Sequence, residues 1–405
     1  MTARTPFIRR AAVLTALLVS ALLLAGAGPA SAAVLDADYL GRIQVADAPA
    51  LRSKAPDLYV PAGVLMTMDG RELWARNPES RRAMASTTKI MTAIVVLEKA
   101  DLNQIVTVDK VASAVGQSSM GLVAGERIPL GELLKGVLVQ SGNDAATLAA
   151  ETVGGSVESF VAMMNAKAAQ LDLVNTHYVN PHGLDAKGHY TSAEDLTALA
   201  RYAMRNPVFR QIVGTYTVKV RSDRYTHVLT NHNSLLKSYK GTEGVKTGWT
   251  DNAGYCVVFA VKRGNIEFVG TVMGAANEVG RAQQATKLMD WGFAHYETTT
   301  IVQGGDALGR VPVSDYLDRT VGAQTAETTS MPVFDLAGPV QRRIELKANV
   351  PAPISKGDVI GTMTLYQGDT VLNQVPVVAS SDVPSPSIGQ RIVFFFARIW
   401  RAVFG

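Results

Sequence analysis

The sequence has one cysteine and few histidines. A single thiol cannot form an intrachain disulfide, and Cys256 lies in the apolar run AGYCVVFAV, so we expect a buried structural thiol with no catalytic role. The six histidines include no His-Glu-x-x-His pattern and no other closely spaced ligand set, and His182 in NPHGLD is expected to shape a turn. The sequence therefore predicts no metal site and no bound cofactor.

Acidic residues are absent from both ends of the chain. The first 32 residues carry three arginines and the last 20 carry three more, so the net charge of +4 for the whole chain becomes −2 for the body between them. The basic patch typical of nucleic-acid binding is therefore missing, and we expect no nucleic-acid partner. At 405 residues and 47% hydrophobic, the chain is large enough for one large core or two smaller ones.

The N-terminal apolar run is too short for an ordinary membrane span. It covers about 15 residues, against the roughly 20 that a bilayer needs. Three arginines precede it, and the small-x-small site Ala30-Ser31-Ala32 follows. This pattern predicts a signal peptide over residues 1–32 and an exported, extracytoplasmic protein. A short transmembrane anchor is one alternative, and Arg9-Arg10 would also suit twin-arginine export, although a basic leader explains that pair equally well.

The body of the chain opens and closes with strand patterns. GVLMTMDGRELWARN is typical of a hairpin that turns at Asp69-Gly70, and YCVVFAVKRGNIEFVGTVM indicates a second hairpin about Arg263-Gly264. Helical patterns lie between them, including SAEDLTALARYAMRN with Ser192 as its N-cap and Asp195 in its first turn, and KLMDWGFAHYE resembles a closing helix. Strands from both ends with helices between them predict an α+β domain over residues 33–300, with an antiparallel sheet flanked by helices.

The composition changes near residue 300. Short alternating runs broken by Gly, Pro and Asp predict a small all-β domain over residues 301–379. A Ser/Pro linker over 380–387 and a terminal amphipathic helix over 388–405 follow.

A serine and a lysine stand one helical turn apart in MASTTKIMTA. Apolar residues follow at helical spacing from Ile90 to Leu97, so we expect Ser86 and Lys89 to share one face at the head of a core helix. A lysine can take a proton from a serine hydroxyl when burial or a nearby cation depresses its pKa. The pattern alone is weak, because Ser-x-x-Lys arises roughly once or twice by chance in such a chain. A second copy, SLLK, in fact lies at 234–237 and leads into a turn-like stretch.

Two further motifs follow in order. Ser141-Gly142-Asn143 can aim a hydroxyl and an amide at one site, and Lys246-Thr247-Gly248 places a lysine and a hydroxyl beside a glycine that permits close backbone approach. Together with Ser86 and Lys89, these motifs resemble the penicillin-binding serine enzymes, which share the three elements. The segments ASTTKIMTA, SGNDAA, NPHGLD, GVKTGWTDNAGY and the β-rich tail are most similar to the low-molecular-mass D-alanyl-D-alanine carboxypeptidases.

This resemblance implies a β-lactamase/transpeptidase-like fold with a helical subdomain, and an activity. Ser86 would attack the bond between the last two D-alanines of a peptidoglycan stem pentapeptide, Lys89 would take its proton, and water would hydrolyse the acyl-enzyme. Ser141 and Lys246 would pass a proton to the leaving amine, and Asn143 would orient the substrate amide. The implied ligands are stem peptides and β-lactam antibiotics.

The resemblance also implies substrate-binding residues. Backbone N–H groups of Ser86 and Trp249 would form the oxyanion hole beside Gly248, although many relatives carry histidine where this chain has Trp249. Thr247 and Arg281 would hold the terminal carboxylate, for which a guanidinium fork is suited. No local motif marks Arg281, so a solvated arginine at the start of a helix is the alternative there.

Two other functions stay open from the sequence. A class A β-lactamase would need a deacylating glutamate in a Glu-x-x-Leu-Asn loop, and the glutamates between the second and third motifs, at 151, 158, 194 and 243, lack that context. A lactamase would also leave some 105 C-terminal residues unexplained. A non-catalytic cell-wall binding protein on the same fold is the other alternative, against which the intact Ser86 and Lys89 argue.

The C-terminal segment IGQRIVFFFARIWRAVFG separates charge from aromatic side chains. At 100° per residue its three arginines fall within an arc of about 80°, and most of the remaining circumference is apolar. A helix lying in the headgroup region would bury the aromatic side chains and leave the guanidinium groups with anionic lipid. We therefore expect attachment to the outer face of the cytoplasmic membrane, with packing of the helix on the β domain as the alternative.

Overall fold

The computed structural model describes residues 33–35 and 56–404, which form two compact units. One unit holds residues 56–296 and all three motifs; the other holds residues 297–404 together with 33–35. The predicted signal peptide over residues 1–32 lies outside the described residues.

A five-stranded antiparallel sheet forms the centre of the first unit. Its order is β3-β2-β10-β9-β8, so strands from the beginning and the end of the unit lie side by side. The strands are β2 (Ala62–Thr67), β3 (Glu72–Arg76), β8 (Thr242–Thr250), β9 (Gly254–Arg263) and β10 (Ile266–Ala275). Both predicted hairpins are confirmed, and Gly70 and Gly264 supply the positive φ angles of their turns.

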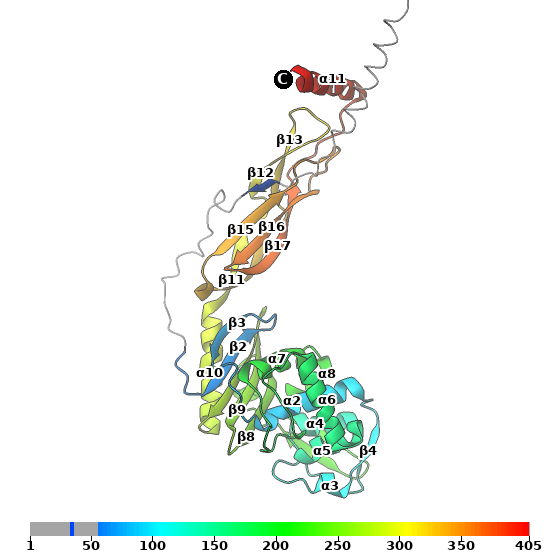
Figure 1. Cartoon of the computed structure of the whole chain (residues 1–405), viewed down its shortest axis with the longest axis vertical. Helices are drawn as coiled ribbons and strands as arrows, with labels where there is room; N and C mark the ends of the chain where they lie inside the picture. Colours follow the sequence, from blue (N-terminus) through cyan, green and yellow to red (C-terminus); the bar gives the residue numbers. More distant parts are fainter. Residues whose placement is uncertain (1–32, 36–55, 405) are drawn as a thin grey trace, which may run out of the picture. The chain divides into compact units, whose positions relative to one another are not determined.

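Helices cover both faces of this sheet (Figure 1). On one face Thr197 of α7 (Ala193–Ala203) lies 2.7 Å from Thr271, Oγ1 to Oγ1. On the other face Gly292 of α10 (Glu278–His295) packs against Phe268. Residues 268 and 271 of β10 point to opposite faces, since side chains alternate along a strand. The sheet is therefore the middle of three layers.

Most of the remaining helices of the first unit gather in a lobe beside the sheet (Figure 1). They are α2 (Lys89–Lys99), α3 (Lys110–Ser113), α4 (Leu130–Leu138), α5 (Asn143–Gly154), α6 (Val157–Gln170) and α8 (Pro207–Val213), and the short helix α9 (Leu235–Ser238) packs against β8. Two small two-stranded antiparallel sheets lie among them: β4 (Ile105–Thr107) with β5 (Arg127–Pro129), and β6 (Thr217–Arg221) with β7 (Thr226–Thr230). Residues 89–96 of α2 are all buried. The sequence predicted an apolar stripe along one face of this helix. Because other helices surround α2, its buried surface extends beyond that one face.

Three helices begin at residues other than the sequence pattern indicated. The segment Ala85–Thr88 is a 3₁₀ turn, and the α-helix begins only at Lys89. The closing helix α10 begins at Glu278, nine residues before the predicted stretch, because Asn277 caps it by accepting a hydrogen bond from Gly280 N. The SLLK stretch forms the single turn of α9. The predicted N-cap Ser192 is confirmed, since its Oγ accepts from Asp195 N at 3.1 Å.

The second unit is mostly strands. A six-stranded antiparallel sheet has the order β1-β15-β16-β17-β13-β12, and β11 pairs separately with β14. The strands are β1 (Ala33–Leu35), β11 (Tyr296–Val302), β12 (Ala307–Pro312), β13 (Thr320–Thr325), β14 (Thr329–Phe334), β15 (Val340–Leu346), β16 (Val359–Gln367) and β17 (Thr370–Ala379). A separate apolar core, with Met363 and Leu365 fully buried, fills this unit.

The terminal helix α11 (Ile388–Phe404) contacts the β-rich unit through its arginine face. Arg401 forms a two-pronged ion pair with Asp318, 3.1 Å on each side, and Arg398 donates to the carbonyl oxygens of Ser314 and Tyr316. The aromatic face stays exposed: Trp400 retains 65% of its accessible surface. In the part of the chain that the structure describes, no helix is long and apolar enough to span a membrane.

Candidate active site

Residues from all three motifs line one cavity of about 970 Å³ in the first unit. The lining residues come from the 3₁₀ turn, the starts of α5 and α10, strands β8 and β9, and the loops between elements. They are Ser86, Gln117, Ser118, Ser141, Asn143, Gly183, Leu184, Asp185, His232, Thr247, Gly248, Trp249, Thr250, Asp251, Tyr255, Glu278 and Arg281. Predicted site residues more than 190 positions apart in sequence therefore meet at one place.

Close backbone approaches hold Ser86 in position. Ala85 has a φ of +50°, and neighbouring glycines allow the chain to pass close to it. A Cβ on Gly248 would lie 2.8 Å from Ser86 N, and a Cβ on Gly183 would lie 2.0 Å from the carbonyl oxygen of Ala85. Only glycine permits this packing of strand β8 and loop 180–189 against the turn. The glycine of the third motif therefore acts in the packing of the nucleophile turn.

Lys89 is fully buried and has three oxygen neighbours. Its Nζ lies 3.0 Å from Ser86 Oγ, 2.7 Å from Asn143 Oδ1 and 2.6 Å from the carbonyl oxygen of His182. Burial, helped by the charge of Lys246, holds the pKa of Lys89 well below its ordinary value, and the carboxylate of Asp144 partly opposes this shift. The amine next to the serine hydroxyl is therefore poised to lose its charge.

The second motif supplies the opposite wall of the cavity. Ser141 is buried, with a φ of +62° that turns the chain sharply before α5. Asn143 begins that helix, and its Nδ2 donates to the carbonyl oxygen of Gly116 at 3.0 Å. Its Oδ1 consequently points at Lys89. The amide thus has a fixed orientation.

The third motif and α10 supply the cationic end of the cavity. Lys246 is buried and donates to the carbonyl oxygen of Thr247 at 3.0 Å. Burial and then the charge of Arg281 lower the pKa of Lys246 to about 7. Arg281 is itself buried in the first turn of α10, where it pairs with Glu278 at 3.1 Å. The alternative of a solvated arginine is therefore wrong.

Trp249 presents its side chain at the mouth of the cavity. It is 52% exposed, and its ring centroid lies 5.8 Å from that of Tyr255. Because Trp249 follows Gly248 on β8, its backbone lies close to the 3₁₀ turn while its indole points outward.

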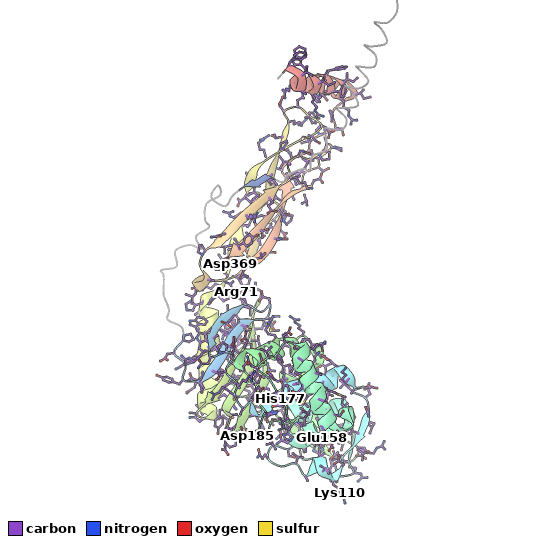
Figure 2. All side chains as sticks on the ribbon, viewed as in Figure 1. Arg71, Lys110, Glu158, His177, Asp185 and Asp369 are labelled. Atoms are coloured by element: carbon purple, nitrogen blue, oxygen red, sulfur yellow. The ribbon has the colours of Figure 1, made fainter. Side chains whose placement is uncertain are left out.

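Several groups that sequence motifs did not mark also line or support the site. The carbonyl of His182 is a partner of Lys89, and Gln117 and Ser118 come from a loop without any motif. Asp185, on the loop beside β8, accepts from Thr250 Oγ1 at 2.8 Å (Figure 2). Loop residues such as these have no periodicity or spacing that sequence reasoning could use. Among these loops, only the segment NPHGLD was noted in the sequence, where His182 was predicted to shape a turn.

Cys256 and the glutamates considered for a β-lactamase lie outside the residues that line the cavity. Cys256 is buried, and its burial raises the pKa of the thiol to about 11. None of the four glutamates considered for a β-lactamase is among the residues that line the cavity. Among the described residues, no group of three or more His, Cys, Asp or Glu side chains could hold a metal ion.

Comparison with known proteins gives consistent matches. Residues 51–277 match the peptidase S11 family model, D-alanyl-D-alanine carboxypeptidase, and residues 296–385 match that of the C-terminal domain of penicillin-binding protein 5. D-alanyl-D-alanine carboxypeptidase DacF of Bacillus subtilis is 36% identical over 331 residues, covering 80% of this chain and 85% of the relative.

Solved structures agree with these matches. The Streptomyces strain K15 DD-transpeptidase superposes with a TM-score of 0.58 at 35% identity, over 60% of this chain and 99% of that one. Penicillin-binding protein 5 from Haemophilus influenzae gives a TM-score of 0.61 at 29% identity, over 82% of this chain and 99% of that one. The α+β, transpeptidase-like fold is thereby confirmed. With its three motifs in one cavity, the chain belongs to the D-alanyl-D-alanine carboxypeptidases of the peptidase S11 family, which are serine hydrolases.

Proposed function

We propose that this enzyme removes the terminal D-alanine from peptidoglycan stem pentapeptides through an acyl-enzyme on Ser86. The observation that carries the proposal is the set of oxygen atoms around Lys89. A neutral amine has two N–H groups and one lone pair. The Asn143 Oδ1 and the His182 carbonyl oxygen can only accept, so they take the two N–H groups. The lone pair is left for the hydroxyl proton of Ser86, 3.0 Å away.

Acylation then follows from this arrangement. Lys89 takes the hydroxyl proton as Ser86 Oγ bonds to the carbonyl carbon between the two D-alanines. Backbone N–H groups of Ser86 and Trp249 stabilise the oxyanion, and the tight contact of Gly248 with the nucleophile turn supports this pairing. When the C–N bond breaks, Ser141 and Lys246 deliver a proton to the departing amine. A pKa of about 7 lets Lys246 exchange protons near neutral pH. Water then hydrolyses the ester: its hydroxide adds to the acyl carbon, and its other proton returns to Ser86 Oγ. The proton held by Lys89 replaces the one that Lys246 gave to the amine, which restores both lysines.

The cationic end of the cavity suits the free carboxylate of the leaving D-alanine. Arg281 and the hydroxyl of Thr247 can bind its two oxygens, because both side chains line the cavity beside Lys246. Asn143 is positioned to hold the substrate amide on the other side. A β-lactam carries a carboxylate and a strained amide in a related arrangement, so we propose that β-lactams acylate Ser86 as well.

We also propose where the enzyme works and how its chain is divided. Residues 1–32 direct export, 33–300 catalyse the reaction, 301–379 form a β-rich spacer, and 380–387 link it to the helix over 388–405. The exposed aromatic face of α11 supports attachment to the outer face of the cytoplasmic membrane. The arginines of this helix have protein partners, which argues against the expected arginine contacts with anionic lipid.

Mass spectrometry of a synthetic stem pentapeptide incubated with the mature protein tests the reaction. We expect the loss of one alanine, and a covalent penicillin adduct in a parallel sample. Ser86→Ala should give neither. An intact peptide together with no adduct from the wild-type protein would show that the chain binds cell wall without catalysis. Rapid turnover of penicillin, with the peptide left intact, would show a β-lactamase.

A further inference from the structure

Asp144 directly follows Asn143, and its carboxylate is completely buried. Buried carboxylates need hydrogen-bond partners to offset the loss of water. Four of its partners belong to one segment, residues 119–122. They are Ser119 Oγ at 2.6 Å and the backbone N–H groups of Met120 at 3.0 Å, Gly121 at 3.1 Å and Leu122 at 3.1 Å. Asp144 also accepts from Ala145 N, the next residue of its own helix.

The residues just before this segment line the cavity. Gln117 and Ser118 contribute to its wall, and Gln117 has a φ of +67°. Ser118 is bonded to the second motif and to the residue before it. Its Oγ donates to the carbonyl oxygen of Gln140 at 3.0 Å, and its own carbonyl oxygen accepts from Asn143 N at 2.7 Å. Residues 116–122 therefore wrap around the start of α5.

The same segment orients the Asn143 amide. The carbonyl oxygen of Gly116 accepts from Asn143 Nδ2 at 3.0 Å, which leaves Asn143 Oδ1 facing Lys89 at 2.7 Å. If the segment moved, the amide would lose the acceptor that fixes its orientation. Lys89 would then lose one of the two acceptors that leave its lone pair for Ser86.

We propose that Asp144 is a positioning residue, whose carboxylate holds residues 116–122 against the start of α5 and thereby orients the Asn143 amide toward Lys89. The inference rests on the roles proposed above for Lys89 and Asn143. Asp144 touches neither Ser86 nor the cavity and acts through its neighbours.

The charge of Asp144 provides a readout that a purely structural role would not change. Asp144 raises the pKa of Lys89, whereas burial and Lys246 lower it. Two histidines also interact with Lys89, His182 and His232, and the pKa of each is lowered chiefly by burial. Replacing Asp144 by a neutral residue therefore lowers the pKa of Lys89 further. The amine would lose its proton at lower pH.

Asp144→Asn is the main test, with acylation by a fluorescent penicillin measured across pH. Asparagine lacks the second carboxylate oxygen, which accepts the bonds from Ser119, Gly121 and Leu122. We expect acylation to slow at least tenfold, amide hydrogen exchange at residues 120–122 to accelerate, and the acid limb of the acylation profile to move to lower pH. Wild-type acylation with an unmoved acid limb would overturn the proposal.

Two further variants separate the charge from the hydrogen bonds. Ser119→Ala keeps the charge of Asp144 but removes one of its partners and the bond from Gly121 N to Ser119 Oγ. We expect a two- to fivefold slower acylation, faster exchange at 120–122, and an unmoved acid limb. Glu158→Gln makes the same chemical change as Asp144→Asn at an exposed position in the helical lobe, and it should match the wild type (Figure 2).

If Asp144→Asn does not fold, Ser119→Ala is the deciding variant. Unchanged exchange at residues 120–122 together with wild-type acylation in Ser119→Ala would overturn the proposal. Failure of the proposed function is distinguishable, because in that case the wild-type protein itself would form no penicillin adduct.

Discussion

At the scale of single residues, two buried lysines set the chemistry of the site. Lys89 and Lys246 each have a lowered pKa, and desolvation is the largest cause for both. Each lysine also has a second cation near it: Lys246 acts on Lys89, and Arg281 acts on Lys246. Arg281, which suits a substrate carboxylate, thus lowers the pKa of Lys246, and the charge of Lys246 in turn lowers the pKa of the general base Lys89. One arrangement of charge serves both binding and proton transfer.

Lys246→Gln should move the pH dependence of acylation. Below about pH 7 Lys246 is charged, and that charge lowers the pKa of Lys89. Its removal raises the pKa of Lys89, so the acid limb of the acylation profile should shift to higher pH. Loss of proton delivery should also slow acylation by about 100-fold or more. Stopped-flow acylation across pH measures both effects, with the exposed Lys240→Gln as control. A slower reaction with its acid limb unmoved would contradict the charge coupling.

At the scale of elements, the sequence predicted the strands and turns that have a regular residue pattern, and it missed short segments that have none. The hairpins at Asp69-Gly70 and Arg263-Gly264 have alternating strands and turn glycines, and both were correct. The sequence did not predict the 3₁₀ turn before Lys89, because a single turn is too short to show a hydrophobic period. The closing helix α10 was predicted only from KLMDWGFAHYE onward, because the residues that follow its cap, Asn277, include few apolar side chains. The sequence pattern therefore did not indicate that Arg281 is buried.

The residues of the candidate site can likewise be separated into those that the sequence motifs predicted and those that they did not. Its motif residues have fixed spacing, and all of them line the cavity or, like Lys89 and Lys246, are buried beside it. Its loop residues, such as Gln117 and the carbonyl of His182, are placed by tertiary contacts alone. No local pattern encodes a backbone carbonyl as a ligand, because every residue has one.

Gly248→Ala tests the contact between strand β8 and the nucleophile turn. The added methyl would lie 2.8 Å from Ser86 N and 3.0 Å from Ala85 Cβ, so the strand or the turn must shift. We expect a loss of about 1–3 kcal/mol in the free energy of unfolding. Acylation should fall by about 10²–10³-fold, as when one oxyanion-hole donor is misplaced.

Gly389→Ala is the matched control for this variant, since its methyl would meet no atom within 4 Å and no residue of α11 lines the cavity. Thermal unfolding and penicillin acylation measure the two effects. If Gly248→Ala acylated as fast as Gly389→Ala, the close approach would not matter for catalysis.

At the scale of the whole molecule, two units with separate cores divide the work. The first unit holds the cavity, and the second holds a β-rich sheet and the terminal helix. Within the second unit the helix is held by its cationic side, through Arg401 to Asp318 and through Arg398 to two carbonyl oxygens. The side that remains exposed is aromatic, with Phe396 and Trp400 each more than half exposed. Such a surface favours the interfacial region of a membrane over water.

Removal of residues 388–405 should therefore release the enzyme from membranes without affecting its chemistry. The truncated protein should appear in the soluble fraction after export and still form the penicillin adduct, because no residue of α11 lines the cavity. In the full chain, Phe396→Ser with Trp400→Ser should weaken binding to lipid vesicles strongly, since burying each ring is worth about 1.5–3 kcal/mol. Arg401→Gln should weaken it little, because Arg401 already pairs with Asp318. A truncated protein that stayed with membranes after cleavage of its signal peptide would show that α11 is not the anchor. A larger loss from Arg401→Gln than from the double aromatic variant would show that lipid charge, and not the aromatic face, holds the enzyme at the membrane.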